Sequence, residues 1–282
     1  MELLNDLASL RAWVAARDLA RERIGFVPTM GALHAGHLSL VRQARLRCDR
    51  VVASIFVNPT QFGPHEDFAN YPRTLEADRA MLAGEGCDAL FLPDAGMIYP
   101  DGFGTRVVVG PLGEDLCGRS RPGHFDGVAL VVTILFHLVR PAVAFFGLKD
   151  YQQFVVIRRM ARDLAMPVEV VGLPTVREAD GLAMSSRNRY LEPGERQRAG
   201  SLYRALLAAK ERYRAGERDP AVLEGEALRV LREGGIEGVE YVAVREAESL
   251  APMERVSGEP VMLLAARVGR ARLIDNMVLS LA

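Results

Sequence analysis

The sequence predicts an α/β protein: a Rossmann-like, doubly wound parallel sheet followed by a second, smaller α+β domain. Two observations predict the sheet. Short apolar runs alternate with segments of helical periodicity, and residues 51–57 (VVASIFV) are almost continuously apolar, as in a strand covered on both faces. The β-α-β spacing ends after about Val176, which predicts a change of domain there. We therefore expect domains at residues 1–176 and 177–282.

Parallel strands need helical crossovers, and the first domain supplies a candidate helix between each pair of candidate strands. The expected strands are residues 24–28, 51–57, 89–93, 143–146 and 168–173, and the expected helices are 36–47, 74–85, 127–138 and 151–164. Apolar residues at helical spacing from Leu3 to Val14 predict an amphipathic first helix, and residues 106–109 read as a short peripheral strand.

The second domain mixes helices and strands without β-α-β spacing. A long charged helix is expected to open at Glu192 and to run to about Ala215, and another helix is expected within residues 220–232. Residues 239–244 and 261–268 have the apolar composition of strands.

The bulk composition is that of an ordinary globular protein, and it argues against several functional classes. The 282 residues carry a formal net charge of −1, so no overall positive field favours nucleic acid or an anionic membrane. No apolar run approaches the roughly 20 residues of a membrane span, and the N-terminus lacks a signal-peptide layout. Cys48, Cys87 and Cys117 are widely spaced and predict reduced structural thiols in a cytoplasmic protein, with a catalytic cysteine as the alternative.

Three of the expected strands are each followed, near the strand end, by a residue of a candidate motif. His34, Asn58 and Gly147 occupy these positions. Ligands of doubly wound sheets bind at the carboxyl ends of the strands, near the switch in strand order. We therefore expect these three segments to meet at one site.

His34 and His37 lie between an apolar strand and a helical pattern, with Gly36 between them. If the helix begins near Gly36, both imidazoles and several unpaired backbone N–H groups converge at its N-terminus, which favours an anion such as phosphate. Two alternatives remain open. The pair could chelate a metal, although no third ligand has an obvious spacing, or a histidine could only cap the helix.

Two further segments carry side chains suited to a small hydroxy acid or an anion. Asn58 and Gln61 offer donors and acceptors for hydroxyls and a carboxylate, while the alternative is a proline-containing turn. Arg121 and His124 lie in the glycine-rich basic loop 119–127, which could form a mobile gate over an anionic substrate or an ordinary solvated loop.

Charged and hydroxyl side chains follow the last two strands of the first domain. Lys149 is placed as a point charge for phosphates, and Asp150 could accept from a ribose hydroxyl or cap the next helix. In the segment MSSRN, residues 184–188, two hydroxyls and the Arg187 guanidinium can hold phosphate; the alternative is a polar turn between domains.

These segments together resemble the pantoate–β-alanine ligase (pantothenate synthetase) family, a member of the HxGH nucleotidyltransferase superfamily. The resemblance runs through nearly the whole chain. Its motifs are PTMGALHAGH (28–37), FVNPTQF (56–62), RPGHF (121–125), GLKDYQQ (147–153), MSSRN (184–188) and ARLIDN (271–276).

The resemblance implies an ATP-dependent condensation of pantoate with β-alanine. Pantoate's carboxylate would attack the α-phosphate of ATP, giving a pantoyl adenylate and pyrophosphate. The amine of β-alanine would then displace AMP to give pantothenate. It also implies Mg²⁺, held chiefly by the phosphates without a dedicated protein metal site, and a homodimer formed through the first domain.

Site residues follow from the same resemblance, position by position. The catalytic residues would be His34, His37, Lys149 and Arg187, and the residues that bind pantoate and β-alanine would be Asn58, Gln61 and Gln153. The ATP site would comprise Met30, Gly31, Ala32, Leu33, His34, Ala35, Gly36, His37, Gly147, Leu148, Lys149, Asp150, Val176, Met184, Ser185, Ser186 and Arg187. The family commonly has a polar residue where this chain has Leu148, so only backbone contacts are expected there.

Two other functional classes remain possible from the sequence alone. A nucleotidyltransferase that leaves the nucleotide on its product would use the same histidines, lysine and Ser-Ser-Arg segment. A non-catalytic nucleotide sensor or RNA-binding relative is the second, and the near-neutral charge argues against its RNA-binding form. Release of AMP that depends on β-alanine separates a ligase from both.

Overall fold

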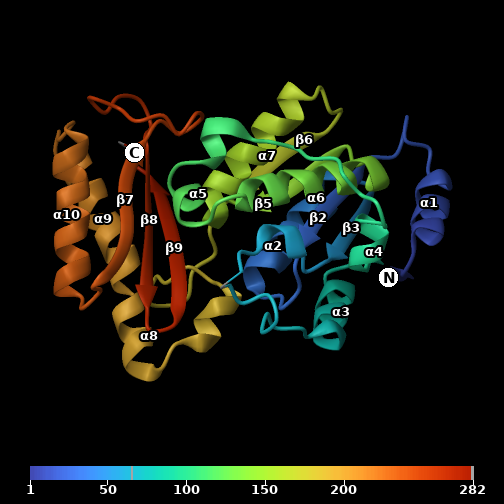
Figure 1. The fold of residues 1–282 in the computed structure, drawn as a ribbon, viewed down its shortest axis with the longest axis horizontal. Helices are drawn as coiled ribbons and strands as arrows, with labels where there is room; N and C mark the ends of the chain where they lie inside the picture. Colours follow the sequence, from blue (N-terminus) through green and yellow to red (C-terminus); the bar gives the residue numbers. More distant parts are fainter. Residues whose placement is uncertain (65, 281–282) are drawn as a thin grey trace. The chain divides into compact units, whose positions relative to one another are not determined.

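The computed structural model describes residues 1–64 and 66–280, which form two compact units (Figure 1). The first unit consists of Met1–Leu148 with Val156–Pro174, and the second consists of Lys149–Val155 with Thr175–Ala282. These units differ from the expected domains, 1–176 and 177–282, at residues 149–155 and 175–176. Residues 149–155 begin a helix which then continues in the first unit.

The first unit contains a six-stranded sheet in which every paired strand is parallel, as the fold class requires. The strand order is β1-β4-β3-β2-β5-β6. The strands are β1 (Glu2–Leu4), β2 (Ile24–Thr29), β3 (Arg50–Ile55), β4 (Ala89–Phe91), β5 (Val143–Gly147) and β6 (Glu169–Leu173). The predicted α/β class and the five predicted strands are confirmed.

The helices of this unit connect the strands. They are α1 (Leu7–Ala15), α2 (Ala35–Arg47), α3 (Leu75–Gly84), α4 (Ala95–Ile98), α5 (Cys117–Ser120), α6 (His124–Val139) and α7 (Tyr151–Asp163). Short 3₁₀ turns are η1 (Pro59–Gln61), η2 (Gly110–Gly113) and η3 (Leu148–Asp150).

Helices cover both faces of the sheet, which explains why its strands are apolar on both sides. Val27 of β2 belongs to a buried cluster with Val41 of α2, whereas the adjacent Phe26 packs edge-on against Phe136 of α6 at 6.5 Å between ring centroids. Successive residues of a strand point to opposite faces. The helices α2 and α6 therefore lie on opposite faces.

Strand order reverses between β2 and β5, and this reversal positions the candidate site. From β2 the chain proceeds outward through β3 to β4, while β5 pairs with the other side of β2 and leads outward to β6. The turns after β2 and β5 therefore leave neighbouring strands at the same edge of the sheet. That is the switch point where doubly wound sheets bind ligands.

Two expectations for the first unit were wrong. The first helix does not include Leu3, because residues 2–4 form β1 beside β4, and the helix begins after Asp6, whose carboxylate accepts from Ser9 N at 2.6 Å. Residues 106–109 are not a strand. Val108 is 72% exposed, and the backbone N–H of Val109 donates to Asp126 Oδ1 at 2.9 Å instead of to another strand.

The second unit contains a three-stranded antiparallel sheet in the order β7-β8-β9. Its elements are η4 (Ser186–Tyr190), α8 (Pro193–Ala199), α9 (Ser201–Arg214), α10 (Pro220–Glu233), β7 (Gly238–Arg245), β8 (Val261–Val268) and β9 (Ala271–Val278). The long helix expected from Glu192 to about Ala215 was wrong as a single element, because it is divided at Gly200, and glycine is a weak helix former. β9 was not predicted.

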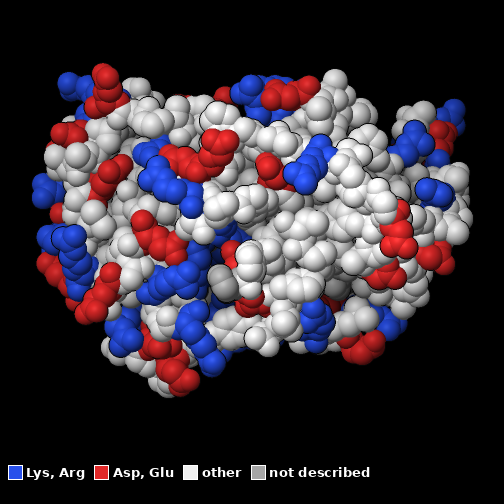
Figure 2. All heavy atoms as spheres, in the orientation of Figure 1, with Lys and Arg blue, Asp and Glu red and all other residues white. Residues whose placement is uncertain are grey.

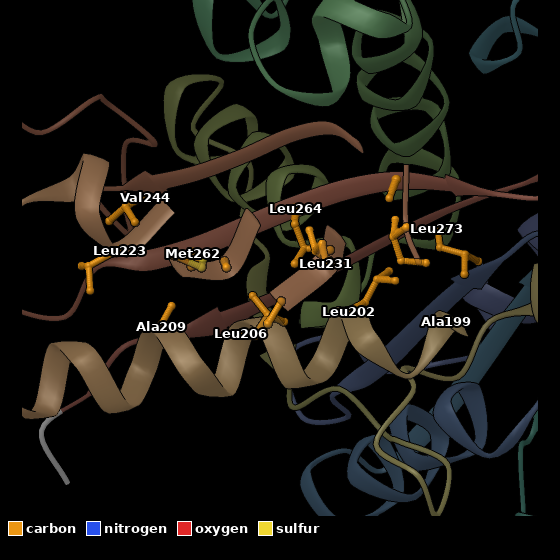
Figure 3. Packing of buried hydrophobic residues seen from close by; sticks show 14 of the residues in the cluster. Ala199, Leu202, Leu206, Ala209, Leu223, Leu231, Val244, Met262, Leu264 and Leu273 are labelled. Atoms are coloured by element: carbon orange, nitrogen blue, oxygen red, sulfur yellow. The ribbon is translucent and has the colours of Figure 1, made fainter. Parts of the chain in front are cut away.

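The core of the second unit lies between its sheet and the helices α9 and α10 (Figure 3). Leu202 and Leu206 of α9 face Leu264 of β8, with Leu223 and Leu231 from α10 in the same fully buried group. This packing makes the sheet a rigid support for the polar residues of β9 described below.

No described helix has both the length and the apolar character needed to cross a bilayer. The three cysteines form no disulfide with one another: Cys87 and Cys117 are buried, and Cys48 is partly buried. Burial raises the pKa of the Cys87 thiol to about 11, which disfavours the nucleophilic thiolate.

Gly225 lies within α10 and Gly234 at its C-terminal end. Together they give a matched test of the packing between α9 and α10. A Cβ at Gly234 would lie 1.9 Å from Ser201 Oγ and 2.5 Å from Ser201 Cβ, whereas a Cβ at exposed Gly225 would contact nothing within 4 Å. Gly234→Ala should destabilise the protein by about 1–3 kcal/mol through overpacking. Gly225→Ala should stabilise it by roughly 0.5–1 kcal/mol, since alanine is the better helix former. Urea unfolding measures both, and equal effects would contradict the packing described.

Candidate functional site

Two imidazoles cap the N-terminus of α2. His34 Nδ1 accepts from the backbone N–H of Gly36 at 3.2 Å, and His37 Nδ1 accepts from the backbone N–H of His34 at 3.4 Å. The rings lie side by side, with centroids 4.2 Å apart, and both residues are half-buried. The structure therefore confirms that a histidine caps the helix, which was one of the interpretations left open by the sequence.

These caps determine where each neutral imidazole carries its proton. A ring nitrogen that accepts a hydrogen bond has no proton, so the proton of a neutral His34 or His37 resides on Nε2. The caps thus use one nitrogen of each ring and make the other a hydrogen-bond donor. With the dipole at the N-terminus of α2, this arrangement favours an anion.

The turn between β2 and α2 is held in a left-handed conformation. Gly31 has φ of 82° and Ala32 has φ of 50°, which is unusual for a residue with a side chain. The buried carboxylate of Asp78 on α3 holds it, because Oδ2 accepts from Ala32 N and Oδ1 from Leu33 N, both at 2.9 Å. Asp78 is a functional residue that the sequence analysis missed.

A signal for Asp78 was present in the sequence. Asp78 shares the helical stripe of Leu75 and Leu82, where an apolar residue is the norm. A charged residue in that position is 1% exposed in the structure and must have partners to be stable there. One partner is local, since Thr74 Oγ1 donates to Asp78 Oδ1 at 3.1 Å. The two backbone partners lie 45 and 46 residues away, and local periodicity carries no information about them.

Asn58 caps the N-terminus of η1, which follows β3, and Gln61 is the last residue of that turn. Asn58 Nδ2 donates to Gln61 Oε1 at 3.1 Å, and Gln61 Nε2 contacts Met30 Sδ at 2.9 Å. Asn58 Oδ1 accepts from Thr60 N at 3.3 Å and from Tyr99 Oη at 2.8 Å. Asn58 is therefore a supporting residue that orients Gln61, and Gln61 reaches the residue that opens the turn after β2.

Gly127 lets α6 approach η1 closely. Asn58 Nδ2 donates to Gly127 O at 3.1 Å, and a Cβ on Gly127 would lie 2.3 Å from Thr60 O. Only glycine fits at this distance, so the backbone of α6 itself lines the back of η1.

In the basic loop before α6, the charge of Arg121 is paired with that of Glu66. Arg121 Nε donates to Glu66 Oε1 at 2.6 Å and Arg121 Nη2 to Glu66 Oε2 at 2.5 Å. Arg121 Nη1 also bonds His124 Nε2 at 2.9 Å, and because a guanidinium only donates, His124 Nδ1 carries the proton donated to Gln61 O at 2.7 Å. This network supports the Gln61 backbone, and the Arg121 charge expected to meet an anionic substrate is engaged by Glu66.

In the second unit, Lys149 and Asp150 precede α7. Lys149 Nζ lies 3.4 Å from Asp150 Oδ1, and the side chain of Lys149 is 19% exposed. Gln152 is buried at 4% exposure, while Gln153 is half-buried. Of the two neighbouring glutamines, Gln153 is thus the more accessible.

The Ser-Ser-Arg segment follows a tight hairpin in the same unit. Met184 N donates to Val176 O at 3.0 Å, so two expected ATP-binding residues are directly paired. Ser185 then caps η4, with its Oγ accepting from Arg187 N at 3.3 Å. Ser185, Ser186 and Arg187 are all half-buried.

The structure brings the expected site residues into two groups. In the first unit, Met30–His37, Asn58 and Gln61 are linked by hydrogen bonds at the carboxyl edge of the sheet, where Gly147 and Leu148 also leave β5. In the second unit, Lys149, Asp150 and Gln153 form one segment, and Val176 and Met184–Arg187 form another. Among residues 1–64 and 66–280, no three His, Cys, Asp or Glu side chains converge as a metal site.

The chain is similar throughout its length to proteins of one family. A family model described as pantoate–β-alanine ligase matches residues 2–278. The pantothenate synthetase of Magnetococcus marinus is 58% identical over 281 residues, covering 99% of this chain and 96% of the relative; that of Moorella thermoacetica is 53% identical over 279 residues, covering 99% of each.

Two solved structures have the same fold. The crystal structure of pantothenate synthetase from Thermus thermophilus has a TM-score of 0.93 at 51% identity, covering 99% of both chains. The pantoate–β-alanine ligase of Francisella tularensis, crystallised with β-γ ATP and β-alanine, has a TM-score of 0.82 at 33% identity, covering 99% of this chain and 97% of that one.

The hold of Asp78 on the turn can be tested with a matched pair of substitutions. Asp78→Asn keeps the shape but faces one of the two backbone N–H groups with an amide donor, which should cost about 1–3 kcal/mol of stability. Asp94 accepts a single N–H, from Met97 at 2.8 Å, at the exposed start of α4. Asp94→Asn should stay within roughly 0.5 kcal/mol, because asparagine also caps helices well. Denaturant unfolding compares them, and a harmless Asp78→Asn would refute the assignment.

The Glu66–Arg121 pair predicts a pH dependence of stability. Burial raises the pKa of Glu66, but the hydrogen bonds and positive charge of Arg121 outweigh it, so the folded-state pKa lies below the ordinary 4.5. The stabilisation is then complete above the unfolded-state pKa and is lost as pH falls through the folded-state pKa. The difference in unfolding free energy between wild type and Glu66→Gln, about 1–3 kcal/mol at neutral pH, should shrink only below about pH 5. A difference that is constant down to about pH 3.5 would contradict the ion pair.

Proposed function

Because this chain belongs to the family of pantoate–β-alanine ligases, we infer that it condenses pantoate with β-alanine at the expense of ATP. The observation that carries this conclusion is the match of the family model to residues 2–278. The geometry is consistent with it, since an anion site at a helix N-terminus lies beside amide side chains suited to a small hydroxy acid.

We propose that the reaction proceeds in two transfers. A carboxylate oxygen of pantoate attacks the α-phosphorus of ATP, the bond to the bridging oxygen breaks, and pyrophosphate leaves with that electron pair. The amine of β-alanine then attacks the acyl carbon of pantoyl adenylate, loses a proton and expels AMP. Adenylation converts a carboxylate, which resists attack by an amine, into an acyl group with a stable leaving group.

His34 and His37 are proposed to stabilise the first transition state. Their Nε2–H groups are fixed as donors by the caps at Nδ1, so they need no rearrangement when negative charge grows on the phosphate. Most backbone N–H groups between Met30 and Gly36 are engaged within the turn, so this segment is proposed to shape the ATP site around the two imidazoles. Neutral donors such as these imidazoles act without gaining or losing a proton.

Gln61, supported by Asn58, is proposed to hold pantoate, together with Gln153. The support for Gln61 is its position between Asn58 and Met30, which places an amide at the edge of the turn. Pantoate would exchange the weak contact between Gln61 Nε2 and the Met30 sulfur for a stronger hydrogen bond to oxygen.

The remaining residues are proposed to bind the nucleotide from the second unit and from the end of β5. Lys149 and Arg187 would take up the charge that moves toward pyrophosphate, and Ser185 and Ser186 would donate hydrogen bonds to phosphate oxygens. Backbone groups of Gly147, Leu148, Asp150, Val176 and Met184 would line the nucleoside.

Mg²⁺ is proposed to enter with the nucleotide. Mg²⁺ retains waters and is coordinated mainly by phosphate oxygens, so it needs few protein ligands. When bound, the ion neutralises phosphate charge, and the protein's part is to orient the triphosphate through its own donors.

Two further properties are proposed. A homodimer formed through the first unit is supported by exposed Phe103 and Val108 in a segment, residues 103–109, without helix or strand, and by the broad uncharged area over that unit in Figure 2. A cytoplasmic location is supported by three cysteines that form no disulfide with one another, two of them buried, as expected of a protein in a reducing compartment.

Exchange of labelled pyrophosphate into ATP tests the reaction and the role of His37 together. Wild-type protein should catalyse exchange with pantoate alone, without β-alanine, because the first transfer is reversible. His37→Ala should slow this exchange about 100- to 1,000-fold, as expected for loss of one preorganised donor, while ATP binding weakens by less than about tenfold.

His137, an exposed histidine of α6 whose Nδ1 bonds Thr133 O at 2.8 Å, provides the control, and His137→Ala should exchange at the wild-type rate. If exchange required β-alanine, the adenylate would not form before β-alanine binds, and the proposed first transfer would be excluded. Equal losses of rate and ATP affinity in His37→Ala would remove its role in the transition state.

A further inference from the structure

Two adjacent residues of β9, Asp275 and Asn276, are buried polar side chains to which the proposed reaction gives no role. They are 2% and 7% exposed, and their neighbours Ile274 and Met277 are apolar. A polar group is stable at such a position only when it is hydrogen-bonded. Its partners therefore indicate its purpose.

Asp275 forms a bidentate ion pair with Arg177. The distances are 2.6 Å from Nη1 to Oδ2 and 3.0 Å from Nη2 to Oδ1. The guanidinium also donates to Gly181 O at 3.0 Å and lies 4.2 Å over the ring of Tyr203. Arg177 is thus fixed by its charge, its hydrogen bonds and its stacking.

Arg177 belongs to the hairpin that leads into the Ser-Ser-Arg segment. It pairs with Ala183 across the hairpin, and the next pair is the hydrogen bond from Met184 N to Val176 O at 3.0 Å. Fixing Arg177 therefore fixes the point from which Ser185 and Arg187 extend.

Asn276 reaches the other nucleotide-binding segment of the second unit. Its Nδ2 donates to the backbone carbonyl of Lys149 at 2.8 Å. This carbonyl lies where the 3₁₀ turn η3 passes into α7. Holding it restricts rotation of the peptide that follows Lys149 and thereby the direction in which the Lys149 side chain leaves the chain.

The strand β9 presents these two residues on opposite faces of one sheet. Successive side chains of a strand alternate between faces, and the register places Asp275 beside Leu264 and Asn276 beside Leu263 of β8. Both partners in β8 are buried, and Leu264 lies in the core shown in Figure 3. One well-packed strand therefore serves as a common reference for both segments.

We propose that Asn276 is a positioning residue for Lys149, and that β9, through Asp275 and Asn276, fixes the spacing between Lys149 and the Ser185–Arg187 segment. This inference rests on the proposed roles of Lys149 and Arg187 in holding the nucleotide. Asn276 acts through Lys149 and needs no contact of its own with substrate.

A double-mutant cycle on pyrophosphate exchange tests the inference. Asn276→Leu removes the donor and keeps the branched shape of the side chain, and Asn276→Ser is a smaller second variant in case the Leu variant does not fold. Each should slow exchange per folded enzyme about 10- to 100-fold, the scale expected when a catalytic group is displaced by about 1 Å. Met277→Leu, a volume-conserving change at the next position, should leave the rate unchanged.

The combination with Lys149→Ala separates positioning from a general structural effect. Once the ammonium is absent, Asn276→Leu should slow exchange no further, since residues that act as a unit are not additive. An unchanged rate for Asn276→Leu and Asn276→Ser, or effects that multiply with Lys149→Ala, would overturn the inference while leaving the role of Lys149 intact. A wild-type rate for Lys149→Ala alone would instead overturn the role of Lys149, and the inference with it.

Discussion

The hydrogen bonds from backbone N–H groups to the Nδ1 atoms of His34 and His37 are the interaction on which the site depends. The first N–H groups of any helix lack acceptors within the helix, and here the two imidazoles each accept from one such N–H group. The consequence is chemical as well as structural, because each cap leaves the proton of the neutral ring on Nε2. Asp78 stabilises the same arrangement, because it holds the left-handed turn that immediately precedes His34.

Around this turn, several polar side chains bond to other residues of the candidate site. Asn58 orients Gln61, and the Glu66–Arg121–His124 network holds the Gln61 backbone. The second unit is built in the same way, with Asp275 and Asn276 behind the Ser-Ser-Arg hairpin and Lys149. Preorganised donors are effective in catalysis because they require no rearrangement as charge develops.

The sequence predicts the sheet well and the supporting residues poorly, for a physical reason. Strands buried on both faces leave continuous apolar runs, which is why residues 51–57 were recognisable. β9 escaped because Asp275 and Asn276 interrupt its apolar pattern, and their partners Arg177 and Lys149 lie 98 and 127 residues away. The ligand-facing candidates were found from strand ends and from family resemblance, whereas such long-range partners leave no local periodicity.

The most direct test of the central claim is the protonation state of the two imidazoles, read by ¹H–¹⁵N correlation spectra of protein labelled in its five histidines. His34→Gln and His37→Gln variants assign the two resonance sets. The account predicts that both neutral rings carry the proton on Nε2, and that ATP shifts the Nε2 resonances of both more than the Nδ1 resonances. A proton on Nδ1 of either ring, or spectra that ATP leaves unchanged, would contradict it.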